Sequence, residues 1–497
     1  MGSVPGVDRF RRRGRRARPA RCRPCSGRAR VTGTIPVDSP RRLNALEAMM
    51  WRAEADPRLR HPVVIVDLLD VEPDWDRVLE SHDRATRVVP RLRDRVLEPW
   101  WGWGLPEWSP DPSFSLGFHV RRMRLAEPGG LSSLLDLAAT WAATPFDRAR
   151  PPWEALLVTG LDGGGAGYLL KVHHSLADGV GLVQILSLLH GHGRAAEPGV
   201  PVGEAPARGG RSRFGLTAAR TAEVLGAAPA ALLGVLAAAA GGAAGHVRHP
   251  ATAVRDGAAF VASAARAAVP HHAQPSPLLR HRSLNRRFLV WDVELEGLKR
   301  AGRAAGGSLN DAYVAAVLGG MARYHRRMGV PVPERVPVGM PMNTRVASDA
   351  LGGNHWAGLR FAAPVGEDDA AARIGLVRDI VAGLRQERIT DALGLIAPLL
   401  AALPPVVLAR VQGGATRGND VQVSNIPGMT RPAFVAGARI ERSYAFGPLP
   451  GGAVMVALMS DADVCHVGAT VDPAAVTAPE VLAACVEEAF GEVLALG

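Results

Sequence analysis

Two adjacent histidines followed by an Asp-Gly pair form the densest group of reactive side chains in the sequence. His173 and His174 come directly after the apolar run Tyr168–Val172, and Asp178 lies four residues beyond His174, followed by Gly179. Neighbouring residues at the end of a strand point to opposite sides, so only one of the two histidines can face a given cavity. This argues against a metal site with two histidine ligands. A single strand-end histidine is suited to act as a general base on a hydroxyl or a thiol.

Asp178 and Gly179 lie in a turn between this strand and an apolar helix that the pattern predicts over Val180–Leu189. The glycine permits a tight turn, and the aspartate is within reach to orient the histidine loop. The structural alternative is that His173 and His174 are a core or loop pair whose hydrogen bonds are satisfied locally.

Alternating strands and helices around this group predict an α/β or α+β fold. We expect a β-hairpin from Glu154–Thr159 and Gly167–Val172, joined by a glycine-rich turn. Further strands are predicted at Pro62–Leu69, Arg287–Val293, Arg335–Met340, Trp356–Ala362, Asp420–Val423, Val454–Ser460 and Cys465–Thr470. Helices are predicted at Leu43–Trp51, Trp75–His82, Leu131–Ala143, Leu295–Ala305, Leu309–Met328, Ala370–Glu387 and Pro479–Leu496.

Composition divides the 497 residues into four segments. Residues 1–33 form an Arg-rich tail that we expect to be disordered. Residues 34–195 and 283–497 are the two predicted domains, joined by an Ala/Gly/Pro-rich helical linker at 196–282. Within the linker, Val224–Gly245 carries no charge, but it consists mostly of Ala and Gly with Pro229 inside. Such residues provide little transfer free energy, so a helical connection able to lie on a lipid surface is favoured over a membrane span.

The net charge of +11 comes almost entirely from the tail, whose first 30 residues hold 11 arginines and one aspartate. We therefore expect no nucleic-acid-binding surface on the folded part of the chain. The tail is interpreted either as a solvated segment that contacts anionic lipid or, by slight preference, as the product of a start codon placed upstream of Val31 or Val37. Few cysteines indicate a reduced, cytoplasmic setting. Cys22 and Cys25 have no matching second pair, so no metal site is expected.

Five motifs in order give the sequence a resemblance to a known family. His173-His174-x-x-x-Asp178-Gly179 matches the HHxxxDG signature of the CoA-dependent acyltransferase superfamily. The other four resemble motifs of its bacterial wax ester synthase/diacylglycerol acyltransferase branch over about residues 43–497. These are Pro145–Glu154 (PLDRxRPLWE), Ser283-Leu284-Asn285 (PLN), Asn310-Asp311 (ND) and Ser424–Gly428 (SNVPG). The departures are mild: Pro152 replaces a leucine, Ser283 a proline and Ile426 a valine.

The resemblance implies two chloramphenicol-acetyltransferase-like domains, each with a mixed sheet flanked by helices and with an active-site channel at their interface. His174 is then the general base, and Asp178 supports the histidine loop structurally. Asn310, or Ser424 with Asn425, would donate hydrogen bonds to the oxyanion. The substrate-binding residues implied are His173, Gly179, Asp311, Ser424 and Asn425.

By the same resemblance, the chain is an O-acyltransferase that moves a long-chain acyl group from acyl-CoA to a fatty alcohol or a diacylglycerol. Acyl-CoA is a co-substrate, and no further cofactor or metal is implied. We expect a cytoplasmic protein in peripheral contact with a membrane or lipid-droplet surface. The alternatives are an acyltransferase for a polyketide, peptidyl or sugar hydroxyl, and a non-catalytic lipid-surface binding protein.

Overall fold

The computed structural model describes nine stretches of the chain, and the predicted tail at 1–33 and most of the predicted linker lie outside them. They are residues 40–102, 104–195, 209–223, 225–226, 273–343, 356–386, 408–410, 418–429 and 431–497. Cys22, Cys25 and nearly all of Val224–Gly245 also lie outside the described residues. From Val37 onward the chain forms one compact unit.

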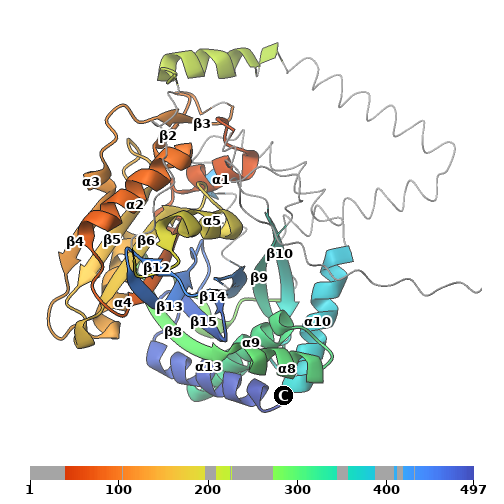
Figure 1. The fold of residues 1–497 in the computed structure, drawn as a ribbon. Helices are drawn as coiled ribbons and strands as arrows, with labels where there is room; N and C mark the ends of the chain where they lie inside the picture. The colour runs from red at the N-terminus through yellow and green to blue at the C-terminus, as the bar shows by residue number, and fades with distance from the viewer. Residues whose placement is uncertain are drawn as a thin grey trace, which may run out of the picture. The chain divides into compact units, whose positions relative to one another are not determined.

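The larger of the two main sheets has seven strands in the order β4-β5-β6-β1-β13-β12-β7 (Figure 1). Its strands are β1 (Pro62–Leu69), β4 (Val120–Arg124), β5 (Trp153–Thr159), β6 (Ala166–His173), β7 (His190–Gly191), β12 (Phe434–Val435) and β13 (Ala438–Phe446). The central β1 is antiparallel to both of its neighbours, β6 and β13. A small separate sheet pairs β2 (Asp94–Leu97) with β3 (Glu107–Pro110).

Helices cover both faces of this sheet, which explains why β1 is apolar on both faces except at the buried Asp67. Val63 and Ile65 pack in the same cluster as Val78 of α2 and Leu182 of α5. On the opposite face, Val64 packs in the same cluster as residues of α4. The helices of this half are α1 (Ala45–Ala53), α2 (Trp75–Val88), α3 (Leu116–His119), α4 (Leu131–Ala143) and α5 (Gly179–Leu189).

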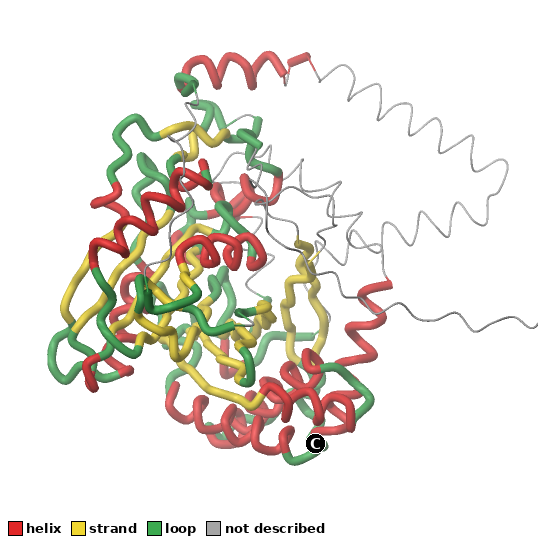
Figure 2. The backbone as a smooth tube through the Cα atoms, viewed as in Figure 1, coloured by secondary structure: helices red, strands yellow, loops and turns green. Residues whose placement is uncertain are grey.

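The second sheet has six strands in the order β10-β9-β11-β14-β15-β8. Its strands are β8 (Arg287–Glu294), β9 (Val336–Asn343), β10 (Trp356–Ala363), β11 (Val421–Pro427), β14 (Val454–Asp461) and β15 (Val464–Val471). β11 is parallel to β9 and β14, so the sheet is mixed. Helices lie beside this sheet, as the red segments next to its strands in Figure 2 show. They are α8 (Leu295–Ala304), α9 (Leu309–Arg327), α10 (Ala370–Gln386) and α13 (Pro479–Leu494).

The two halves are interlocked, because β12 and β13 come from the C-terminal half yet complete the first sheet. At this junction the phenol of Tyr444 on β13 donates to the carboxylate of Asp292 on β8, at 2.9 Å. The rings of Phe288 and Phe446 stack with their centroids 3.8 Å apart. The domain boundaries predicted from composition remain a prediction. They did not include the finding that β13, from the C-terminal segment, is a strand of the sheet built by the N-terminal segment.

Most elements lie where the pattern placed them. β1 and α4 have their predicted bounds, β5 and β6 form the predicted hairpin, and α2 continues past His82 to Val88. Within the described part of the chain, no helix combines the length and the apolar character that crossing a membrane requires.

Candidate active site

The two histidines stand at the end of β6, where the strand turns into a short loop before α5. His173 is the last strand residue and pairs with Pro62 at the start of β1. The backbone N–H of His174 donates to the carbonyl of His61 at 2.9 Å. His173 is fully buried, whereas His174 is only half-buried. The two neighbouring imidazoles therefore differ in their exposure to solvent.

His173 is held by groups on both of its ring nitrogens. The backbone N–H of Ser175 lies 3.0 Å from Nδ1, and Nε2 lies 3.0 Å from a carboxylate oxygen of Glu54. A backbone N–H can only donate, so Nδ1 accepts and Nε2 carries the proton that points to Glu54. Both ring nitrogens of His173 are thus occupied by groups of this chain, and its predicted role in binding substrate stays a prediction.

Burial and neighbouring charges determine the ionisation of Glu54 and His61, the two groups beside His173. Burial raises the pKa of Glu54, but the facing His173 and the N–H of His61 outweigh it and lower the pKa to about 2. Burial, with a further contribution from His173, lowers the pKa of His61 to about 3. At neutral pH a carboxylate therefore faces His173, while His61 is uncharged.

The segment that resembles PLDRxRPLWE builds the wall around His173. The ring centroid of Phe146 lies 6.1 Å from that of His173, and Trp51 of α1 meets the imidazole edge-on at 5.1 Å. The guanidinium of Arg148 lies 4.6 Å above the Trp51 ring. Phe146 and Arg148 of this segment, together with Trp51, therefore form the surroundings of the first histidine.

Asp178 is the N-cap of α5, and its carboxylate accepts the backbone N–H of Gly181 at 2.8 Å. This contact supports the structural role expected of it, because capping fixes where the histidine loop ends and the helix begins. A Cβ added at Gly179 would lie 3.7 Å from the side chain of Ile426 on β11. The structure thus brings the SNVPG-like strand of the C-terminal half against the start of α5.

The three candidate oxyanion donors lie in the second half of the chain. Ser424 is half-buried on β11, where it pairs with Ala457, and Asn425 beside it is exposed. Asn310 is half-buried in the first turn of α9, and its amide nitrogen lies 3.8 Å from the sulfur of Met340 on β9. Sulfur is a weak acceptor, so this contact leaves the amide of Asn310 able to bind a better partner.

Asp311, predicted to bind substrate, takes part in a capping box at the start of α9. Its carboxylate accepts the backbone N–H of Ser308 at 2.8 Å and the hydroxyl of Ser308 at 2.7 Å. The described contacts of Asp311 are therefore those of a helix cap. Its substrate role remains a prediction without a contact to support it.

Within the stretches that the structure describes, no three or more His, Cys, Asp or Glu side chains lie together in an arrangement that could bind a metal ion. At the end of β6 the structure places the half-buried imidazole of His174 beside the buried pair of His173 and Glu54.

Sequence reasoning missed Glu54 and His61. Glu54 follows α1 and His61 precedes β1, so both resemble ordinary loop residues in the hydrophobic pattern. The pairing of β1 with β6 brings His61, the residue before Pro62, next to His174. The sequence predicted both strands but not that they pair with each other, so His61 could not be placed beside His174.

Family models match most of the described chain. The wax ester synthase/diacylglycerol acyltransferase catalytic domain matches residues 43–313, and the C-terminal domain of the same family matches residues 352–493. A proposed diacylglycerol O-acyltransferase of Mycobacterium tuberculosis is 39% identical, with 92% of this chain and 93% of the relative covered. A second from that organism is 27% identical, with 84% and 88% covered.

Solved structures share the fold. A wax ester synthase/diacylglycerol acyltransferase from Marinobacter aquaeolei superposes with a TM-score of 0.61 at 18% identity, covering 92% of this chain and 98% of that chain. The first condensation domain of the calcium-dependent antibiotic synthetase, with a substrate analogue bound, gives 0.58 at 19% identity, covering 93% and 97%. The starter condensation domain of rhizomide synthetase in complex with C8-CoA gives 0.54 at 14% identity, covering 92% and 94%.

Proposed function

This chain belongs to the wax ester synthase/diacylglycerol acyltransferase family, and we propose that it transfers a long-chain acyl group from acyl-CoA to the hydroxyl of a fatty alcohol or diacylglycerol. The observation that carries the proposal is the exposure difference at the end of β6. His173 is sealed against Glu54, whereas His174 is half-exposed at the start of the loop that leads to α5. One imidazole is fixed as support, and the next is left accessible to a substrate.

In the proposed reaction, His174 accepts the proton of the acceptor hydroxyl while its oxygen attacks the thioester carbonyl. The resulting tetrahedral intermediate carries the charge on the former carbonyl oxygen. Its collapse breaks the carbon–sulfur bond, and the departing CoA thiolate takes the proton from His174. The base is thereby regenerated, and the ester and free CoA are the only products.

The oxyanion of that intermediate needs donors already in place. Asn310 is one candidate, because its amide has only the weak sulfur contact among the described residues. Ser424 with Asn425 on β11 is the other, since this strand reaches the start of α5 through Ile426. Single variants Asn310→Ala and Ser424→Ala separate the two, because removing a true oxyanion donor lowers kcat by about 10²- to 10³-fold.

Peripheral contact with a lipid surface is a further part of the proposal. Trp100 and Trp101 are 53% and 67% exposed, and Phe214 of the helix at residues 213–223 is 67% exposed. The rings of Trp100 and Phe214 meet at 6.1 Å. Exposed tryptophans favour the boundary between water and lipid, where an aromatic ring can be half-immersed.

The test uses the purified full-length chain with palmitoyl-CoA and, separately, hexadecanol or dioleoylglycerol. Release of the CoA thiol and formation of the lipid ester are measured for the unmodified chain, for His174→Ala and for a control, His192→Ala, in an exposed histidine just beyond α5. Acceptor-dependent release that falls at least about 10²-fold in His174→Ala alone supports the proposal. Release with neither acceptor, or release that survives the substitution, contradicts it.

A further inference from the structure

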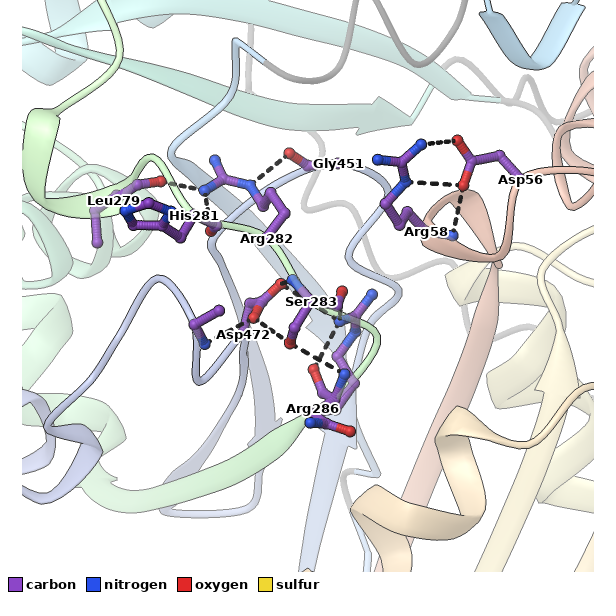
Figure 3. Close-up of polar contacts among 11 residues, drawn as sticks. Asp56, Arg58, Leu279, His281, Arg282, Ser283, Arg286, Gly451 and Asp472 are labelled. Atoms are coloured by element: carbon purple, nitrogen blue, oxygen red, sulfur yellow. Dashed lines mark hydrogen bonds and ion pairs between the residues drawn. The ribbon is translucent and has the colours of Figure 1, made fainter.

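A cavity of about 330 Å³ is lined by four arginines drawn from both halves of the chain. Figure 3 shows three of them, Arg58, Arg282 and Arg286. Arg58 comes from the connection between α1 and β1, and Arg280, Arg282 and Arg286 come from the segment before β8. The loop between β13 and β14 and Asp472 close the other side. We call this cavity the arginine pocket.

The two carboxylates in the arginine pocket are already engaged. Asp472 accepts the backbone N–H of Ser283 at 2.6 Å and its hydroxyl at 2.7 Å, and it also accepts the N–H of Ala474 at 2.9 Å. Asp56 forms a two-pronged pair with Arg58, the shorter bond being 2.7 Å. The lining of the pocket thus contains four arginines and two aspartates, and Asp472 accepts its hydrogen bonds mainly from Ser283.

The guanidinium groups of the two half-buried arginines, Arg282 and Arg286, donate to carbonyl groups, which orient a positive charge without neutralising it. Arg282 donates to the carbonyl of Gly451 at 2.9 Å, and its nearest carboxylate, Asp420, is 4.0 Å away. Arg286 donates to the carbonyl of Asn285 at 2.7 Å, with Asp472 at 3.7 Å. Such fixed donors are the arrangement that recognises phosphate oxygens.

Arg280 completes the set as an exposed residue that makes no hydrogen bond or ion pair with the described part of the chain. Burial lowers the pKa of Arg282 and of Arg286, which shows that their charges are held at a desolvation cost. An anion entering the pocket would offset that cost. The chemistry of the arginine pocket is therefore that of a phosphate-binding site.

The arginine pocket is connected to the active site by a short piece of chain. His61 follows Arg58 by three positions in the chain, so their Cα atoms lie within about 11 Å of each other. His61 in turn accepts the backbone N–H of His174. In acyl-CoA the pantetheine arm separates the reacting thioester from the phosphates, so the phosphates must bind at a distance from the base.

We propose that the arginine pocket binds the phosphate groups at the adenosine end of acyl-CoA. This assignment rests on the proposed function, because it supplies a place for the part of the donor that does not react. A phosphorylated lipid headgroup shares the same chemistry, so the experiment must separate these two sources.

The first measurement is independent of turnover. Isothermal titration calorimetry with adenosine 3′,5′-bisphosphate is performed on the unmodified chain, on Arg58→Ala and Arg280→Ala, and on Arg303→Ala, an exposed arginine of α8 outside the pocket. We expect Kd to rise about tenfold in each pocket variant, as for the loss of one charge-assisted hydrogen bond, and to stay unchanged in Arg303→Ala. Thermal melting of each variant confirms that it is folded. Arg280→Ala should disturb the fold least, because Arg280 makes no hydrogen bond or ion pair with the described residues.

The second measurement is kinetic. KM for palmitoyl-CoA should rise about tenfold in the pocket variants with kcat unchanged, whereas KM for S-palmitoyl-pantetheine, which lacks the nucleotide, should be the same in all proteins. Nucleotide affinity that does not respond to Arg58→Ala and Arg280→Ala overturns the assignment. Loss of binding to vesicles containing phosphatidic acid, with nucleotide affinity intact, also overturns it in favour of a lipid headgroup. If the nucleotide binds as expected but no acyl transfer occurs, the pocket stands and the proposed function fails.

Discussion

A carboxylate oxygen of Glu54 lies 3.0 Å from Nε2 of His173, and the side chain of each is almost entirely withdrawn from solvent. Since Ser175 donates to Nδ1, this pair locks both the tautomer and the ring orientation of the first histidine. The next residue, His174, is thereby fixed through its backbone. We therefore regard Glu54 as a positioning residue, because it acts on the proposed base only through His173.

Replacement of Glu54 by Gln keeps an acceptor near Nε2 but removes the charge. We expect kcat for acyl transfer to fall about tenfold with little change in KM, because orientation of the base is impaired and substrate contacts remain. Steady-state kinetics of Glu54→Gln beside Glu72→Gln, an exposed glutamate with a surface ion pair, checks this. An unchanged kcat would show that the buried charge has no role in positioning His174.

The same substitution should alter stability in acid. The pKa of Glu54 is lowered to about 2 from an ordinary value of 4.5, so its carboxylate stabilises the fold above pH 4.5, and this contribution is lost as pH falls towards 2. The free energy of unfolding of Glu54→Gln should therefore lie below that of the unmodified chain by on the order of 3 kcal/mol at neutral pH, with the gap closing below pH 4.5. Urea unfolding at pH 7, 4.5 and 3 measures the gap, and a constant difference contradicts the assigned ionisation.

The sequence placed the elements around the site well, because their patterns are local. The apolar run of β1 and the amphipathic repeat of α4 each identify a strand and a helix without reference to the rest of the chain. The histidine loop was recognisable for the same reason, since His174, Asp178 and Gly179 lie within six consecutive residues. Both the secondary structure and the motif could therefore be predicted from residues that are close together in the sequence.

What could not be predicted depends on contacts between distant residues. β13 leaves its own half to pair with β1, and its mixed sequence, which includes Arg439, Glu441 and Arg442, was not among the predicted strands. Glu54 and His61 become part of the site only because β1 pairs with β6 at Pro62. The arginine pocket likewise requires two distant segments to meet, and isolated arginines in an Arg-rich chain give no signal of their own.

Buried His82 should make the fold sensitive to acid. Its Nδ1 lies 2.7 Å from the carbonyl of Val78 and its Nε2 2.8 Å from the hydroxyl of Tyr168, and burial lowers its pKa to about 4. The unfolded chain therefore binds one more proton than the folded chain between pH 6.5 and 4, so stability falls as pH drops through that window. His82→Gln should lessen this fall by about 2 kcal/mol, measured by urea unfolding at pH 7 and 4.5. The exposed His192→Gln serves as control, and an equal pH dependence in both variants would falsify the assignment.

Ser283 stands where the related motif has a proline, and the structure shows what the serine adds. Both its N–H and its hydroxyl donate to Asp472, whereas proline would supply neither donor. We expect Ser283→Ala to lower the free energy of unfolding by about 1 kcal/mol and Ser283→Pro to lower it further, since the second variant leaves more of the carboxylate unbonded. Chemical denaturation of both beside the exposed Asn285→Ala measures the order. A proline variant as stable as the unmodified chain would contradict it.

Exposed Trp100 and Trp101 provide the test of lipid-surface contact. Replacing both by Ser removes aromatic area that is 53% and 67% exposed, so the folded core loses little while affinity for a lipid surface falls. We expect at least a tenfold weaker partition onto phosphatidylcholine vesicles, measured by flotation. Activity on a short, water-soluble alcohol should not change.

The matched control for this pair is Met123→Ser, which alters an exposed apolar side chain on β4 that is 39% exposed. Vesicle binding should survive this substitution, because a single exposed methionine does not form the aromatic patch that Trp100 makes with Phe214. If the tryptophan and methionine variants bind vesicles equally well, the patch does not mediate contact with lipid. Reduced activity on the soluble alcohol in the tryptophan variant would instead indicate that these residues support the active site from within the fold.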